Sequence, residues 1–258
     1  MKGEMAWEQV DLSAAALDLP IAVGGSTEPH RLLEAHRHGA FPFPRQQPVQ
    51  AGVTRRTLYE QHVADRRITA FPAAESDDGY AVTWWNPAER PVVRVGSIQL
   101  AGHLRHSRSD GPRWIVTGNH AFAEVLDACR AEADAAWITD DLRASLIALH
   151  RAGWSHSIEV WSEDRLIAGL FGIGMGNVFS VDSAFERRPR ATRVAFADLS
   201  RRLLGQADLI DLQVLHDYTA ALGTSPIRRE QYLEALLSVD MPLTPREGVL
   251  SVRPLPFG

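Results

Sequence analysis

Cysteine, lysine and long apolar runs are nearly absent from this chain of 258 residues. The single cysteine, Cys129, excludes an internal disulfide framework and fits a reducing cytoplasm. Lys2 is the only lysine among the 27 lysines and arginines, so phosphate contacts would be made by guanidinium groups, which bind oxyanions through paired hydrogen bonds. No apolar run reaches membrane-spanning length, and none follows the N-terminus as in a signal peptide. We therefore expect a cytoplasmic protein without a membrane segment.

Net charge and composition further limit the kind of protein and the partners that this chain is expected to bind. A net charge of −5 argues against wholesale electrostatic binding to nucleic acid but leaves room for a local basic cluster. An apolar fraction of 45% and a charged fraction of 23% are those of an ordinary globular protein. The chain is long enough to bury the core of one large or two modest domains.

Patterns that would mark a metal site or a dinucleotide site are missing. The histidine pairs His36/His38 and His103/His106 lack the carboxylates or thiols that would complete a metal site. The glycines of Gly172–Gly176 lead into another apolar strand rather than into a helix, so they indicate a close backbone approach and not a dinucleotide loop. We expect no metal and no cofactor from these patterns.

Local patterning predicts an α+β fold, because helical and strand-like segments mix around an antiparallel hairpin instead of alternating as in a doubly wound sheet. The expected helices have apolar residues at helical spacing and end at glycines or breakers. They are 29–38, 122–132, a helix capped by Thr139 that ends at Gly153, 191–204 and 227–237. The expected strands are 157–161 and 166–173, which form the hairpin through Asp164, and 177–183 and 209–215.

The patterning divides the chain near residue 83. Residues 1–83 are weakly patterned and predict a small N-terminal subdomain. Within it, 44–80 reads as an insertion outside the core because it mixes Gln, Pro, Arg and an Asp-Asp-Gly turn. Residues 84–258 carry the sharper patterns and predict a larger second domain.

The strand-like segment Leu209–Leu215 carries a carboxylate, Asp211, and an amide, Gln213, at a spacing of two. Alternation along a strand would point both side chains to the same face. Burying both is costly unless each finds a partner. From this segment alone, a half-exposed polar face is the simplest interpretation.

Several segments, taken in order, resemble the leucyl/phenylalanyl-tRNA–protein transferase family. They cover roughly residues 29–45 and 84–237, and this many weak motifs in register indicate membership. They are Leu32–Pro42 with its Gly-x-Phe-Pro end, Trp84–Pro87, Trp137–Thr139, Leu149–Trp161, Gly169–Gly172, Phe185 with Ala191–Arg193, Asp211–Val214, and Leu222-Gly223 with Ile227 and Arg229.

The resemblance implies a C-terminal domain like the acetyltransferase fold of the GNAT superfamily, and a reaction between an aminoacyl-tRNA and an amine that needs no metal or cofactor. The family's Asp-x-Gln pair falls on Asp211 and Gln213. We expect Asp211 to accept the proton or orient the amine, and Gln213 to align the nucleophile. The family's glutamate nearby is Asp182 in this chain, and we expect it to be catalytic together with Asp211 and Gln213.

The resemblance also places an apolar pocket for the aminoacyl side chain and the terminal adenosine. The chain departs from the family here: its Ala184 replaces a methionine, Asp182 a glutamate and Val181 a glycine, which changes the shape and the polarity of the pocket together. The residues expected to bind this part of the substrate are Trp84, Trp85, Trp137, Leu170, Ala184 and Phe185.

A basic cluster occupies the helix start where a coenzyme A enzyme would need a glycine-rich pyrophosphate loop. Guanidinium groups beside free backbone N–H groups suit a nucleic-acid phosphate, although a solvated arginine face has the same pattern. The residues expected to bind tRNA are Arg187, Arg188, Arg190 and Arg193, together with Arg105.

Three functions follow from this sequence. The first is an aminoacyltransferase that forms an amide bond between the aminoacyl group of a charged tRNA and an amine such as a protein N-terminus. The second is a divergent homologue that moves another aminoacyl group onto a small-molecule amine in a biosynthetic pathway. The third is a non-catalytic binder of charged tRNA, which the intact Asp211 and Gln213 disfavour.

Overall fold

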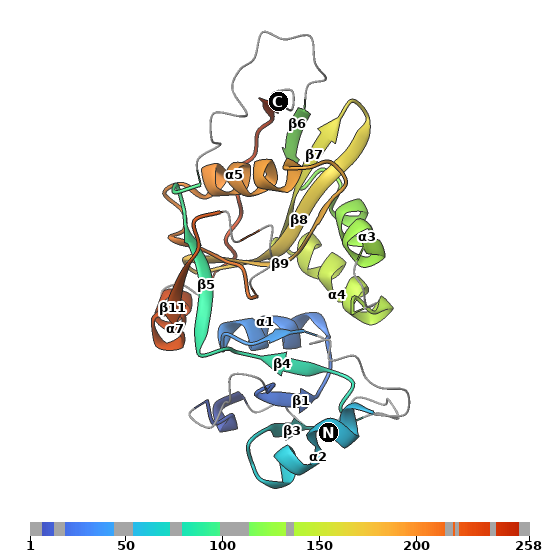
Figure 1. Ribbon diagram of the computed structural model, residues 1–258, viewed down its shortest axis with the longest axis vertical. Helices are drawn as coiled ribbons and strands as arrows, with labels where there is room; N and C mark the ends of the chain where they lie inside the picture. The colour runs from blue at the N-terminus through green and yellow to red at the C-terminus, as the bar shows by residue number, and fades with distance from the viewer. Residues whose placement is uncertain are drawn as a thin grey trace. The chain divides into compact units, whose positions relative to one another are not determined.

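The computed structural model describes residues 7–12, 19–43, 54–72, 79–98, 114–132, 137–214, 219, 222–237 and 241–252. It consists of two compact units (Figure 1). The first unit comprises Met1–Glu89, Asp134–Ser145 and Arg228–Leu233, and the second comprises Arg90–Ala133, Leu146–Ile227 and Glu234–Gly258. Each unit has its own mixed β-sheet, so the predicted α+β class is confirmed.

The first unit is built on a four-stranded sheet of order β2-β4-β1-β3. Strand β1 pairs parallel to β3 and antiparallel to β4, and β4 pairs antiparallel to β2. Its elements are a 3-10 turn (Trp7–Gln9), β1 (Ala22–Gly24), α1 (Pro29–Arg37), β2 (Phe41–Pro42), α2 (Arg55–Ala64), β3 (Thr69–Phe71) and β4 (Thr83–Trp85).

The interpretation of 44–80 as an insertion outside the core is wrong at its C-terminal end. Strand β3 is an integral strand of the sheet, and Ile68 and Phe71 are buried. The strand has only three residues, which is too short for alternation to be recognised among the surrounding polar residues.

The second unit is built on an eight-stranded sheet of order β11-β5-β10-β9-β8-β7-β6-β12. Strand β10 runs parallel to β9 and is connected to it through α5, whereas β8 pairs antiparallel to both β7 and β9. The elements are β5 (Glu89–Arg94), β6 (Trp114–Gly118), α3 (Phe122–Glu132), α4 (Asp140–Arg151), β7 (Ser155–Ser162), β8 (Arg165–Met175), β9 (Val178–Glu186), α5 (Ala191–Leu203), β10 (Leu209–Asp211), β11 (Ser225–Arg228), α7 (Arg229–Leu237) and β12 (Leu250–Val252). Helices α4 and α7 each contribute residues to both units.

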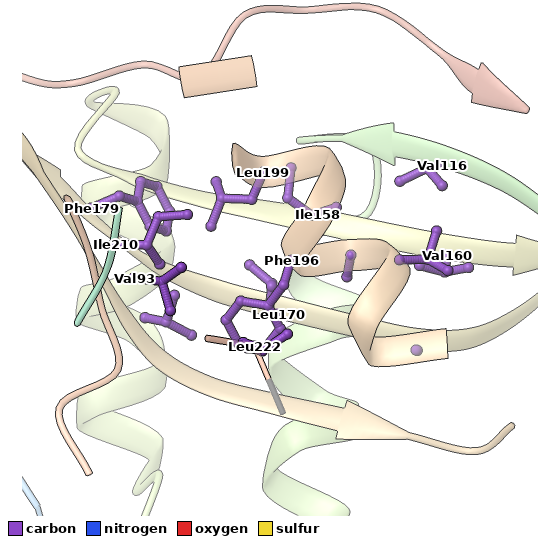
Figure 2. Packing of buried hydrophobic residues seen from close by; sticks show 14 of the residues in the cluster. Val93, Val116, Ile158, Val160, Leu170, Phe179, Phe196, Leu199, Ile210 and Leu222 are labelled. Atoms are coloured by element: carbon purple, nitrogen blue, oxygen red, sulfur yellow. The ribbon is translucent and has the colours of Figure 1, made fainter. Parts of the chain in front are cut away.

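Helix α5 covers one face of the second sheet and α3 packs on the other. Phe196 and Leu199 of α5 lie against Val93, Phe179 and Ile210 of the central strands (Figure 2). On the opposite face, the edge of the Phe122 ring of α3 meets Phe171 of β8, with ring centroids 6.1 Å apart. A residue on these strands therefore faces α5 or the opposite side according to its position in the alternation.

Most of the predicted elements are confirmed. Helices α1, α3, α4 and α5 have the expected bounds within one or two residues, and the Thr139 hydroxyl accepts from the Leu142 backbone N–H as an N-cap. Strands β7 and β8 form the expected hairpin. The glycine run is confirmed as a close approach, since a Cβ atom on Gly172 would lie 2.1 Å from the Ser180 carbonyl oxygen. Cys129 is a buried thiol whose pKa burial raises to about 12.

A buried polar network ties β6 and β7 to the start of α3. The Glu159 carboxylate is fully buried and accepts hydrogen bonds from the hydroxyls of Ser157 and Thr117, both at 2.5 Å. The ring of His156 contacts the Asn119 side chain through Nδ1 and the Gly153 carbonyl oxygen through Nε2 at 3.0 Å. Nε2 donates to that carbonyl. Nδ1 lies 3.1 Å from the Asn119 Nδ2 and 3.3 Å from the Oδ1, and this Oδ1 already accepts from the Ser157 N–H, so Nδ1 accepts from the amide nitrogen of a neutral ring.

The neutral His156 ring makes stability depend on pH. Burial lowers its pKa from 6.5 to about 4, so between these values the unfolded chain binds a proton that the folded chain does not. We expect the free energy of unfolding to fall by roughly 3 kcal/mol as pH drops through this window. Urea denaturation at a series of pH values from 7 to 4 gives the slope of the free energy of unfolding against pH. His156→Gln should flatten this slope, and His30→Gln, at an exposed position, should leave it unchanged. Equal slopes in all three proteins would contradict the assignment.

Candidate functional site

The site is centred on a buried ion pair between neighbouring strands. Asp211 ends β10 and Arg90 lies near the start of β5, which pairs with β10. The Arg90 guanidinium donates to both carboxylate oxygens, through Nε to Oδ1 at 3.3 Å and through Nη2 to Oδ2. Both side chains are at most 1% exposed. A bidentate guanidinium is the partner that offsets the cost of burying this carboxylate.

Gln213 lies in a tight turn, so the prediction of a strand over 209–215 is wrong for 212–214, and Leu215 lies outside the described residues. Its φ is +55°, and the Val214 N–H donates to the Leu212 carbonyl across it at 2.5 Å. The Asp211 carboxylate holds this turn by accepting from the Gln213 backbone N–H at 2.8 Å. Asp211 and Gln213 therefore meet as expected, but through a turn and not by strand alternation. Left-handed backbone is uncommon on residues other than glycine, and strained backbone of this kind clusters at active sites and ligand clamps.

The amide of Gln213 reaches the neighbouring strand β9. Its Nε2 donates to the Ser180 hydroxyl at 3.1 Å and to the Asp182 Oδ1 at 2.7 Å, and the Ser180 hydroxyl donates to the Asp211 Oδ2 at 2.9 Å. Asp182 is the extra residue of a β-bulge, because Gly172 pairs with Val181 while the preceding residue of β8 pairs with Ser183. The structure thus brings Asp211, Gln213 and Asp182 together, on the face opposite to α5.

The residues expected to line the apolar pocket are distributed over the structure. Leu170 and Ala184 are paired on β8 and β9 and belong to the hydrophobic cluster on the α5 face. Phe185 is buried on the α3 side, where a Cβ atom on Gly169 would touch both its ring and Val125.

The three tryptophans expected to bind the substrate, Trp84, Trp85 and Trp137, belong to the first unit. Trp84 is fully buried, its Nε1 donates to the Gly24 carbonyl at 2.9 Å, and its ring meets that of Trp7 edge-on. The Trp85 Nε1 donates to the Thr83 hydroxyl, and Trp137 is half-buried just before α4. Within the first unit, Trp84 and Trp85 therefore serve as core residues.

The arginines expected to bind tRNA precede and open α5, except Arg105, which lies outside the described residues. Arg187 pairs with Glu132 at 2.8 Å, and Arg190 is the N-cap with a φ of +70°. Arg188 is exposed and Arg193 half-buried.

Two of the free backbone N–H groups expected at the start of α5 already have partners. The Glu186 carboxylate accepts from the Thr192 N–H at 2.9 Å, and the Arg188 carbonyl accepts from the Ala191 N–H at 3.1 Å. These two N–H groups are therefore already engaged where a phosphate would lie, and the guanidinium groups are the remaining expected contacts.

Over the described parts of the chain, no three or more His, Cys, Asp or Glu side chains are arranged to hold a metal ion. Nor does any helix in those parts have the length and apolar character needed to cross a membrane.

Comparison with known proteins identifies the family. The family model described as "Leucyl/phenylalanyl-tRNA protein transferase" matches residues 92–237. A leucyl/phenylalanyl-tRNA–protein transferase from Proteus mirabilis (strain HI4320) is 34% identical over 219 residues, which cover 84% of this chain and 80% of the relative. The chain belongs to the leucyl/phenylalanyl-tRNA–protein transferase family. Another transferase of that name, from Shewanella sp. (strain ANA-3), is 32% identical over 236 residues, covering 90% of this chain and 86% of the relative.

Two residues of the site, Arg90 and Ser180, are not among the sequence-predicted ones. Arg90 has a signal in retrospect: it enters the apolar strand Pro91-Val92-Val93, and a buried Asp211 requires an opposite charge. Ser180 has no such signal in the sequence, because only the strand register, which places it opposite Asp211, distinguishes it from any other serine in a strand.

Arg90→Met should destabilise the protein by roughly 3–5 kcal/mol, because it leaves the Asp211 carboxylate buried without its cation. The double variant Arg90→Met/Asp211→Val should recover most of this stability, since an apolar pair replaces the ion pair. Urea denaturation of both variants and the wild type measures the effect. A decrease under about 1 kcal/mol in Arg90→Met would show that the ion pair is not held in the folded protein.

Proposed function

We propose that this chain transfers an aminoacyl group from a charged tRNA to an amine and forms an amide bond. Membership of a family whose relatives are named leucyl/phenylalanyl-tRNA–protein transferases supports the donor and the reaction. We assign catalysis to the second unit, which holds most of the expected catalytic domain 84–258, whereas the expected N-terminal subdomain 1–83 falls in the first unit. The reaction takes place in the cytoplasm. A GNAT-like label for the catalytic domain is supported by the parallel β9–α5–β10 unit in a largely antiparallel sheet.

The observation that carries the assignment of roles is the difference in exposure within the site. Asp211 is 0% exposed, and its carboxylate already accepts from Arg90, Ser180 and the Gln213 backbone. Gln213 is 5% exposed and Asp182 is half-buried, so these two lie on the side from which a substrate arrives. We therefore assign the contact with the amine to Gln213 and Asp182, and a positioning role to Asp211. This revises the proton-accepting role expected of Asp211 from the sequence.

Aminolysis of the aminoacyl ester requires little catalytic assistance from these residues. The lone pair of the neutral amine attacks the ester carbonyl carbon, a C–N bond forms, and the C–O bond to the tRNA ribose breaks. The proton that leaves the amine ends on the released ribose hydroxyl. An amide oxygen accepts a hydrogen bond without taking a proton, so Gln213 orients the amine N–H toward the ester. No metal or cofactor enters this scheme.

The acceptor we propose is the N-terminal amine of a protein, as the names of the relatives state a protein acceptor for them. The direct test offers total tRNA charged with labelled amino acids to a peptide with N-terminal arginine and, separately, to a mixture of small amines. Leucine or phenylalanine on the peptide is the expected result. Label on small amines alone would move the proposal to a biosynthetic transferase, and tRNA binding without acceptor-dependent ester cleavage would establish a binder.

Gln213→Met should lower the single-turnover transfer rate by about 100-fold, because it keeps the side-chain volume but removes the amide that orients the amine. Binding of charged tRNA and the melting temperature should change little. Gln9→Met, the same substitution at an exposed position of the first unit, is the matched control. A wild-type rate in Gln213→Met would remove Gln213 from the reaction.

The basic cluster before α5 should bind the tRNA backbone. Replacing Arg187, Arg188 and Arg190 with alanine should weaken tRNA binding and lower the slope of log K against log salt by about 0.7–0.9 for each phosphate that the variant no longer binds. The control replaces Arg151, Arg165 and Arg246, three exposed arginines elsewhere, with the same change in net charge. If both triple variants show the wild-type slope, the cluster is a solvated face and not a tRNA site.

A further inference from the structure

We propose that Ser180 is a positioning residue that fixes the orientation of the Gln213 amide. The proposal rests on the transfer function above, because it concerns the residue assigned there to the amine. It follows from three hydrogen bonds that meet at Ser180, Gln213 and Asp182 in the middle of the second sheet.

Ser180 stands between the buried ion pair and the amide. It lies on β9 directly opposite Asp211 of the parallel strand β10 and is 3% exposed. Its hydroxyl is 2.9 Å from the Asp211 Oδ2 and 3.1 Å from the Gln213 Nε2. Asp211 and Gln213 make their other contact through the backbone, where the Gln213 N–H donates to Asp211. Among the described contacts, Ser180 therefore provides a side-chain link between the ion pair and the amide.

The direction of each bond follows from what each group is able to donate. The Asp211 carboxylate pairs with a guanidinium and accepts only, so the one hydroxyl proton of Ser180 goes to it. Toward Gln213, the Ser180 oxygen is then left to accept. The amide must present its nitrogen to Ser180, and it presents the second hydrogen of that nitrogen to the Asp182 carboxylate at 2.7 Å. Both amide hydrogens are used, and the carbonyl oxygen is the amide atom that these bonds leave for the substrate amine.

Without the hydroxyl, the amide has no fixed orientation. The terminal torsion of glutamine is broad and roughly two-fold, so packing alone defines the amide orientation poorly. Asp182 alone would hold one of the two hydrogens, and the amide would be freer to turn about that single bond. The backbone of Gln213 would stay in place through its own bond to Asp211. Removing the hydroxyl should therefore affect the reaction step more than the binding of either substrate.

A matched pair of variants isolates the hydroxyl. Ser180→Thr keeps it, whereas Ser180→Val has the same shape and lacks it, so the added methyl group cancels in the comparison. In transfer from charged tRNA to an arginine peptide, we expect kcat of the valine variant to be at least about 10-fold below that of the threonine variant. The acceptor KM and the Kd for charged tRNA should agree between the two within about twofold. Ser180→Ala against wild type gives the same comparison if neither larger variant folds.

A double-mutant cycle separates positioning from a general structural effect. If Ser180 acts through the amide, threonine and valine at position 180 should give equal rates in the Gln213→Met background. A difference that persists in that background overturns the proposal, and so do equal rates with Gln213 intact. If the wild-type protein transfers no aminoacyl group at all, the proposed function itself fails, and the role of Ser180 fails with it. Transfer by the wild type together with equal rates in the pair leaves the function standing and removes Ser180.

Discussion

The buried ion pair between Arg90 and Asp211 is the interaction on which the rest of the site depends. Taking two charges out of water is expensive, and their attraction offsets that cost only with good geometry and further hydrogen bonds. Both conditions hold here, because the guanidinium is bidentate and the carboxylate also accepts from Ser180 and the Gln213 backbone. Replacing a buried ion pair with apolar residues of similar volume often leaves stability unchanged. The charges are therefore better explained by what Asp211 holds in place than by stability.

Asp211 holds in place the backbone turn at Gln213 and the side-chain amide of Gln213. Its bond to the Gln213 N–H supports a left-handed backbone that glutamine rarely adopts, and its bond to Ser180 decides which way the Gln213 amide faces. The bulge in β9 places the Asp182 carboxylate at the second hydrogen of the same amide. The result is a fixed acceptor beside a half-buried carboxylate, on the face of the sheet that α5 leaves uncovered. Such preorganisation suits aminolysis of an activated ester, because holding the two reactants in place provides most of the lowering of the activation barrier.

Much of this arrangement could be predicted from the sequence. Helical periodicity, the Thr139 cap and the hairpin turn are local signals, and they gave α3, α4, α5 and the β7–β8 pair close to their observed bounds. The meeting of Asp211, Gln213 and Asp182 came from family motifs and is present. The turn at Gln213 and the partners of the N–H groups at the start of α5 were missed, since the bond from the Gln213 N–H to Asp211 and the bond from the Thr192 N–H to Glu186 depend on the folded chain. Arg90 and Ser180 depend on strand register, which the local pattern does not specify.

The measurement that tests this account most directly is the transfer rate of a protein whose ion pair has been replaced without unfolding it. Arg90→Met/Asp211→Val removes both charges together, so its melting temperature and tRNA affinity report whether the framework survives. With charged tRNA bound and the arginine peptide saturating, the account predicts a folded protein whose single-turnover rate is lower by about 100-fold or more, because Ser180 and the Gln213 backbone no longer have their acceptor. A rate within roughly threefold of wild type in that folded variant would contradict it.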